Sequence, residues 1–272
     1  MKNILILTQF TLREAFSRKI FIMFSGVTLF ILAVAALIFS FVSVDDFQGM
    51  VNVNGSQLEI FDKIVEVLKL VIVVPLFGIG IFLAIFSTSS FIPHMLEKGS
   101  IDLLLSKPVS RSQVILGKYF GGIAVVFINI AFLILGSWFL IGIKFGNWDP
   151  SFLLTIPTIV FAFAELYSLL ILIGIITQSS VLAMMLTYLI YFIISPILSY
   201  RDNIFSFIES KTTEYILETL YYVLPKTQDL STINSELAAG GSVPDWMPVI
   251  LAFTFIILTI ATSITIFSKK DY

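Results

Sequence analysis

The chain has 272 residues, of which 58% are hydrophobic and only 12% are charged, and its net charge is −2. About a quarter of the residues of a soluble domain are charged, so this composition excludes an ordinary soluble enzyme, and it equally excludes a disordered chain. With no cysteine and a single histidine, the sequence also excludes disulfides, thiolate metal sites and histidine clusters. The small net charge gives no indication of a nucleic-acid partner.

Long stretches that lack Asp, Glu, Lys and Arg predict membrane-spanning helices, because a helix needs about 20 apolar residues to cross a bilayer. The stretch between Asp149 and Arg201 is long enough for two spans and has a polar break at residues 177–180, where we place a tight turn. The first apolar run is too long for a cleaved signal peptide. The predicted fold is therefore an all-α, polytopic membrane protein with six spans. These spans lie near residues 20–43, 68–91, 119–143, 152–174, 180–199 and 246–268.

The distribution of charge predicts that both termini are cytoplasmic, since basic residues concentrate in cytoplasmic loops. In that orientation the inner segments hold ten of the 16 Lys and Arg residues but only four of the 18 Asp and Glu residues. Two termini on the same side require an even number of spans, and six agrees with this. The inner basic residues are Lys2, Arg13, Arg18, Lys19, Lys98, Lys107, Arg111, Lys118, Lys269 and Lys270.

Residues 1–19 are expected to form a cytoplasmic N-terminal helix, ahead of a six-span domain at residues 20–272. Glu14 and Arg18 lie four residues apart, a spacing that supports a helix. Two interpretations stay open for this segment. It is either an interfacial helix that lies on the inner leaflet or the basic anchor of the first span.

The largest segment outside the membrane is predicted between spans five and six, at residues 200–245. Apolar residues recur there at helical spacing until Pro225 ends the run. These residues are Leu217, Leu220, Tyr221 and Leu224. We expect this helix to pack on the outer mouth of the bundle, the alternative being a helix that rests on the lipid headgroups. Trp246 is expected to anchor the last span at the membrane interface.

The inner loop, residues 92–118, is more elaborate than a connection between two spans requires. After a Gly-Ser break, the acidic and apolar run Ser100–Ser106 is expected to be helical, and Pro108 ends it. Ser110 is a candidate N-cap for the next span. The three leucines at 103–105 need a covering partner at a cytoplasmic surface. The loop therefore predicts a short helix that lies across the membrane surface and is presented to a cytosolic protein.

Glu165 is the one residue with an unambiguous charge inside a predicted span. Because a lone carboxylate is costly in the membrane, it should face the bundle or water. We favour a buried structural hydrogen bond, with Tyr167, Ser168 or Thr187 as the partner. The alternative is a contact with substrate or a role in a proton relay.

The chain carries no nucleotide-binding motif. Gly117-Lys118 lacks both the upstream glycine and the following hydroxyl residue of a phosphate-binding loop. The spacing of Gly117 and Gly121 predicts close helix packing instead. No Ser/His, paired-Asp or metal-binding constellation indicates an intramembrane enzyme. We therefore expect a transport subunit that is not an enzyme and needs no metal or cofactor.

The inner loop resembles that of the permeases of type-2 ABC exporters, six-span subunits that work with a separate ATPase. The residues that carry the resemblance are Glu97-x-Gly99, Leu104-Leu105, Pro108-x-Ser110-Arg111 and Gly117-Lys118. The likeness extends over the whole chain, to the N-terminal helix, the six spans, Leu224-Pro225 in the large outer segment and the basic tail at residues 267–271. Size and loop layout are similar to the stand-alone permeases of nitrous-oxide-reductase maturation and gliding-motility systems.

The resemblance implies a half-transporter of a bacterial plasma membrane. Two permeases, identical or paired with a sister, would form the path, and each would dock a cytosolic ABC ATPase through a coupling helix near residues 101–106. The coupling residues implied in this way are Glu97, Gly99, Asp102, Leu104, Leu105, Pro108 and Arg111. Among these, Glu97 and Arg111 are expected to form charge pairs within the loop or with the partner. The substrate stays open, as does the choice between homodimer and heterodimer.

Two other functions are compatible with the residue pattern. One is a gradient-driven carrier or channel, although the scarcity of charges inside the spans and the lack of inverted repeats of broken helices argue against it. The other is a membrane scaffold that recruits a cytosolic protein without transporting anything. The scaffold accounts for the inner loop equally well, and a flux assay separates it from a transporter.

Overall fold

The computed structural model describes residues 2–16, 19–41, 57–97, 99, 109–201, 203 and 211–270, which are almost entirely helical and contain no β-strand. In chain order, the elements up to residue 154 are α1 (Lys2–Phe16), α2 (Lys19–Phe41), α4 (Gln57–Pro75), η1 (Leu76–Gly80), α5 (Ile81–Thr88), α6 (Phe91–Met95), α8 (Arg111–Phe145) and η2 (Pro150–Leu154). The remaining elements are α9 (Thr155–Thr177), α10 (Ser180–Leu189), η3 (Ile190–Ile194), α11 (Ser195–Ser199), α13 (Lys211–Val223), α14 (Thr227–Ala238) and α15 (Met247–Lys269).

Six stretches of these helices are long and apolar enough to cross a membrane, which confirms the predicted number of spans. They are Phe24–Phe41, Lys63–Met95, Arg111–Phe145, Pro150–Thr177, Ser180–Ser199 and Met247–Lys269. The third span is longer than predicted because α8 continues through Lys118 to Arg111 at one end and through Lys144 at the other. Its 35 residues span about 52 Å at 1.5 Å per residue, so α8 extends beyond the hydrocarbon layer.

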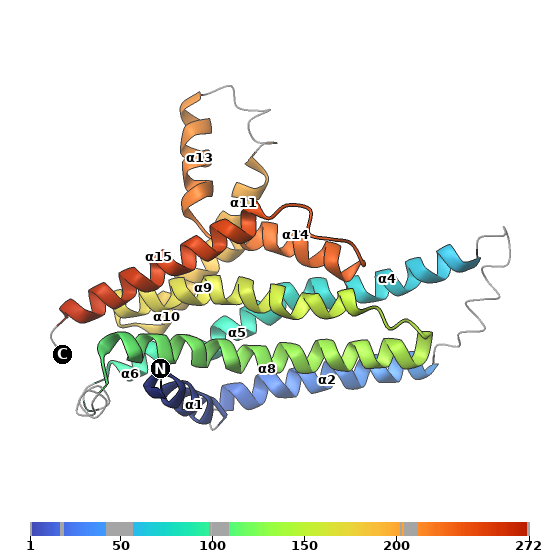
Figure 1. The fold of residues 1–272 in the computed structure, drawn as a ribbon, viewed down its shortest axis with the longest axis horizontal. Coiled ribbons are helices and arrows are strands. Elements are labelled where there is room, and N and C mark those ends of the chain that lie inside the picture. The colour runs from blue at the N-terminus through green and yellow to red at the C-terminus, as the bar shows by residue number, and fades with distance from the viewer. Residues whose placement is uncertain are drawn as a thin grey trace.

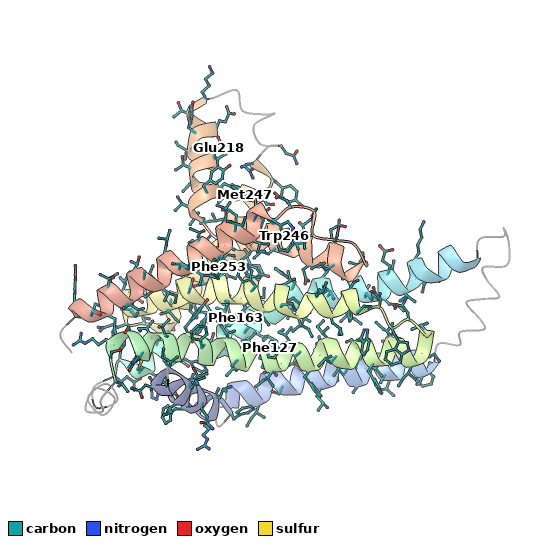
Figure 2. All side chains as sticks on the ribbon, viewed as in Figure 1. Phe127, Phe163, Glu218, Trp246, Met247 and Phe253 are labelled. Atoms are coloured by element: carbon teal, nitrogen blue, oxygen red, sulfur yellow. The ribbon has the colours of Figure 1, made fainter. Side chains whose placement is uncertain are left out.

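The side chains are distributed as lipid-facing helices require, with large aromatic residues on the outside as well as in the core. Phe127 and Phe253 point away from the bundle and are about half exposed, whereas Phe163 is fully buried (Figure 2). Phe163 stacks on Tyr167, which in turn stacks on Tyr119 of α8. Phenylalanine side chains therefore contribute both to the exposed surface of the bundle and to its core.

Helix α9 is the centre of the bundle. It lies between α8 and α15 (Figure 1) and also contacts α5, α10 and α14. Burial reaches 72% of this span, compared with 17–44% of the other five. Most residues of α9 are therefore surrounded by protein rather than by lipid.

The N-terminal helix α1 packs against the inner part of α8 (Figure 1). The two glycines of the predicted close contact make room for it. A Cβ atom built on Gly117 would lie 2.5 Å from Cβ of Leu7, and one on Gly121 would lie 2.5 Å from Cβ of Thr11. The packing prediction for these glycines is confirmed, and their partner is α1.

The outer segment differs from the expectation. Helix α13, which carries the predicted apolar face, contains no buried residue and stands away from the bundle (Figure 1). The next helix, α14, packs on the bundle in its place and buries Leu230, Ile233 and Leu237 against α9, α4 and η2. The sequence pattern missed α14 because its polar residues outnumber its apolar ones. Trp246 is exposed where α15 begins (Figure 2).

Candidate functional site

The first residues of the inner loop form a turn after α6. Glu97 Oε2 lies 3.0 Å from Nδ1 of His94, and both side chains are exposed. Gly99 has φ +89°, a conformation that glycine adopts without strain. The other implied coupling residues of the loop, Asp102, Leu104, Leu105 and Pro108, lie outside the described residues.

The loop ends at the first turn of α8, which is capped as predicted. Ser110 Oγ accepts a hydrogen bond from the Gln113 N–H, and the Gln113 side chain accepts one from the Ser110 N–H, so the two residues form a capping box. The side chain of Gln113 also accepts a hydrogen bond from Asn3 of α1. The C-terminal part of the loop at Ser110, which we call the loop exit, is therefore held by hydrogen bonds at the start of α8.

Arg111 joins this point to the end of the last span. Its guanidinium donates to the carbonyl oxygens of Phe267, Ser268 and Lys270 at 2.8, 3.2 and 2.5 Å. These carbonyls lack partners within α15 because they lie at its C-terminus, where a cation is also favoured by the helix dipole. Among the described residues, then, Arg111 binds the main chain at the end of α15, and Glu97 contacts His94 within the loop.

A second tie lies two turns further along α8. Lys118 Nζ is 2.7 Å from Oε2 of Glu14 on α1, and the two side chains are only 9% and 21% exposed. Lys118 belongs to the Gly-Lys pair that carries part of the family resemblance. Its partner was not predicted, because the two residues are 104 positions apart in the sequence.

A third tie comes from the basic tail. Lys270 Nζ donates to the carbonyl oxygen of Ile175 at 2.7 Å, at the C-terminal end of α9. We call the three ties together (Glu14–Lys118, Arg111 with the end of α15, and Lys270 with the end of α9) the inner frame. The inner frame joins α1, α8, α9 and α15 at the end of the bundle that the charge distribution predicts to be cytoplasmic.

Glu165 lies on α9 and is completely buried. Its Oε1 accepts a hydrogen bond from the main-chain N–H of Lys226 at 2.8 Å, and its Oε2 has no hydrogen-bond partner. The partners expected from the sequence are engaged elsewhere, because the hydroxyls of Tyr167, Ser168 and Thr187 all donate to main-chain carbonyls. No sequence signal pointed to Lys226, since its donor is a backbone group.

Lys226, the residue before α14, is itself buried. Its Nζ donates to the carbonyl oxygen of Leu224 at 2.7 Å and lies 4.1 Å from the centre of the Tyr221 ring. Burial lowers the pKa of Lys226 to about 8, although the nearby Glu165 and Asp229 carboxylates act in the opposite direction. The ammonium group is thus satisfied within its own segment, and the main chain makes the contact with α9.

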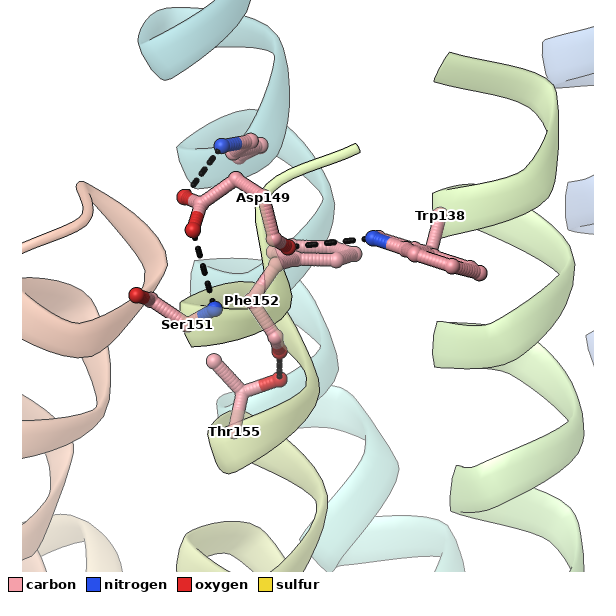
Figure 3. Close-up of polar contacts among 6 residues, drawn as sticks. Trp138, Asp149, Ser151, Phe152 and Thr155 are labelled. Atoms are coloured by element: carbon pink, nitrogen blue, oxygen red, sulfur yellow. Dashed lines mark hydrogen bonds and ion pairs between the residues drawn. The ribbon is translucent and has the colours of Figure 1, made fainter. Parts of the chain in front are cut away.

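Another polar cluster, the outer clamp, ties α4, α8 and η2 together (Figure 3). Lys69 Nζ lies 2.7 Å from Oδ2 of Asp149, whose Oδ1 accepts from the Ser151 N–H at 2.9 Å. Trp138 Nε1 donates to the carbonyl oxygen of Asp149 at 3.0 Å. Burial tends to raise the pKa of Asp149, but the hydrogen bonds from Lys69 and Ser151 outweigh it and the pKa is lowered.

These polar groups hold helices together, and their geometry does not indicate bond chemistry. Within the described part of the chain, no three His, Asp or Glu residues gather to hold a metal ion. The candidate functional site is therefore the exit of the inner loop with the inner frame, and Glu165 is a second, separate polar point.

Comparison with known proteins gives one finding. The model of a family described as ABC-2 family transporter protein matches residues 11–272, which is nearly the whole chain. The matched region includes the inner loop, all six spans and the outer segment. No curated protein matches this chain.

Proposed function

This chain belongs to the ABC-2 family of transporter proteins, and from that premise we propose that it forms half of an exporter driven by a separate cytosolic ATPase. Membership makes it a multi-pass permease component of an ABC transporter. The finer proposal is that two permease subunits form the substrate path and that each docks an ATPase through the loop at residues 97–118. The membrane we propose is the bacterial plasma membrane.

The observation that carries this proposal is the connection between the loop exit and the rest of the bundle. A force applied to the loop reaches α8 at its capped first turn, beside Arg111. From there, Arg111 holds the end of α15, Lys118 holds α1, and Lys270 holds the end of α9. A displacement of the loop exit is therefore passed to four helices at once, as coupling to an ATPase requires.

The energy source must lie outside the chain, because the sequence carries no phosphate-binding loop of its own. The inner loop offers the contact surface, with three consecutive leucines between an acidic residue and a proline. Burial of apolar side chains against a partner is worth about 25 cal/mol per Å². We therefore assign the docking contact chiefly to Leu104 and Leu105.

The test is affinity purification in mild detergent from the native host, followed by identification and ATPase assay of bound proteins. We expect a stoichiometric ATPase that is lost when Leu104→Glu and Leu105→Glu are combined. The matched control is Ile216→Glu, a change at an exposed apolar residue of α13 on the outer side, which should leave the ATPase bound.

Two outcomes would contradict the proposal in different ways. Unchanged association and turnover in the double variant would mean that the loop is not the docking site. A permease that purifies alone and still supports flux would favour the gradient-driven carrier, while a bound partner without any flux would favour the scaffold.

A further inference from the structure

Helix α14 is a separate element laid on the outer part of the bundle, and the chain changes direction at both of its ends. Pro225 precedes it, and Gly240, with φ +85°, follows it directly after its last turn. Its buried face is formed by Leu230, Ile233 and Leu237. The helix is therefore docked through one face and flanked by two points where the chain changes direction.

The docked position of α14 leaves polar atoms unsatisfied. Both side-chain polar atoms of Asn234 are buried without a hydrogen-bond partner, and so is Oε2 of Glu165. Buried polar groups in folded proteins are nearly always hydrogen-bonded, and exceptions mark sites where a state is strained or changes. Water would satisfy all three atoms if α14 moved away from α9.

One hydrogen bond opposes that movement at the start of the helix. The N–H of Lys226 donates to Glu165 of α9, whereas other hydrogen bonds of this turn go to α11 and, through Asp229, to Tyr221 of α13. On α11 the side chain of Ser195 bonds to Thr227 and Gln228, and Ser199 donates to Asp229. In its first turn, α14 is thus joined to α11 by several hydrogen bonds and to α9 by one.

From this arrangement we propose that α14 is a movable outer lid of the permease and that Glu165 is the latch that keeps it docked. The Glu165 side chain suits this task because its oxygen accepts from an N–H at the start of α14, where a helix leaves donors without intrahelical partners. The contact is to the main chain, since the Lys226 ammonium is bound to Leu224. Glu165 is a positioning residue in this account. The role of the lid in transport rests on the proposed function, whereas the latch itself does not.

The absence of cysteine makes a direct test available. A reporter thiol is introduced as Asn234→Cys, at a position that is fully buried and loses no hydrogen bond on substitution. Membrane-impermeant maleimide is then added from the outside, and the labelling rate reports how often α14 leaves its seat. The reporter chain with Glu165 intact is the reference for every other variant.

Removing the latch should speed labelling. We expect Glu165→Ala to raise the rate by about tenfold, because the buried N–H of Lys226 is left without an acceptor. Glu165→Asp keeps the carboxyl group but withdraws the oxygen by about 1.5 Å, so a smaller increase is expected even if the alanine variant does not insert. Glu165→Gln keeps an acceptor and should restore a rate within about twofold of the reference.

Two controls separate the latch from general loosening. Lys226→Met removes the ammonium but keeps the N–H and should label like the reference. Ser168→Ala breaks a buried hydrogen bond between α9 and Thr259 of α15 without touching α14, and it should also leave the rate unchanged. The proposal is overturned if Glu165→Ala and Glu165→Asp both label like the reference, or if Ser168→Ala labels as fast as Glu165→Ala. The assay needs no ATPase, so its failure is distinguishable from failure of the proposed function.

Discussion

At the inner end of the bundle, an ion pair and several capped carbonyls join four helices, whereas at the outer end the start of α14 is joined to α9 by one main-chain hydrogen bond. The groups of the inner frame all have partners. The outer contact contains three buried polar atoms without one. This difference indicates that the inner end is built to move as a unit, whereas at the outer end α14 is built to separate from α9.

The expected free energies of these contacts support the same contrast between the two ends. Removing one partner of a buried ion pair costs about 3–5 kcal/mol, because a charge is left uncompensated. A typical hydrogen bond contributes about 0.5–1.5 kcal/mol, and each unsatisfied buried polar group costs about 1–3 kcal/mol. At the contact between α14 and α9 these two contributions oppose each other, so α14 is held against α9 mainly by its apolar contacts.

Helix α8 connects the two ends. It begins in the inner frame at Arg111 and reaches the outer clamp at Trp138, whose indole N–H binds the carbonyl of Asp149. The clamp in turn holds α4 and η2, against which α14 packs. A displacement at the loop exit therefore has a continuous path of packed helices to the seat of α14.

The largest expected effect lies in the inner frame. Glu14→Gln leaves the buried ammonium of Lys118 without its carboxylate and should destabilise the folded protein by about 2–3 kcal/mol, less than a fully buried pair because Glu14 is partly exposed. Adding Lys118→Met should recover most of that loss. Denaturant unfolding in detergent measures both variants. Equal stability of the single and double variants would show that the ion pair does not hold α1.

A smaller loss of stability is expected when the close packing of α1 on α8 is disturbed. Gly121→Leu places a side chain where Thr11 of α1 already lies, so overpacking should cost about 1–3 kcal/mol and expose α1 to added protease. Gly26→Leu is the matched control, since nothing lies within 4 Å of a Cβ atom at that position. If the two variants melt at the same temperature, α1 is not seated on these glycines.

The third expected effect is the pH dependence of the outer clamp. The pKa of Asp149 is below its usual value of about 3.9, so the folded state favours the ionised carboxylate. Its contribution is present above about pH 4 and is lost as the pH falls through the lowered pKa. Asp149→Asn should reduce Tm at pH 7 by an amount that corresponds to about 2–3 kcal/mol, because the pair is as buried as Glu14–Lys118, and the difference should shrink as the pH falls below about 4. A difference that stays constant with pH would exclude the ion pair as its cause.

The spans could be predicted from the sequence because lipid excludes charge, and five gaps between charged residues are visible by eye. The length of α8 could not, because Lys118 and Arg111 belong to the helix although they lie outside the hydrocarbon layer. Ser110 was found as an N-cap because the capping signal is local. The partners of Glu14 and Lys69 were not found, because long-range pairing leaves no mark in a single sequence.

Glu165 shows the same limit within one residue. The rarity of a charge inside a span predicted a buried, bonded carboxylate, and the structure shows a carboxylate with one bonded oxygen. The partner was missed because it is a main-chain N–H, which every residue except proline carries. Helix α14 was missed for a related reason, since its few apolar residues contact the bundle only after the chain turns at Pro225.

Native-state hydrogen exchange tests the contrast between the two ends most directly. The amides of α14, residues 227–238, are compared with those in the first turns of α8, residues 111–125, in the same sample. A movable lid on a rigid inner end predicts that α14 exchanges at least about tenfold faster than this part of α8. Glu165→Ala should then increase the exchange of α14 alone. Equal protection of the two segments, or an increase that spreads through the inner frame, would contradict the account.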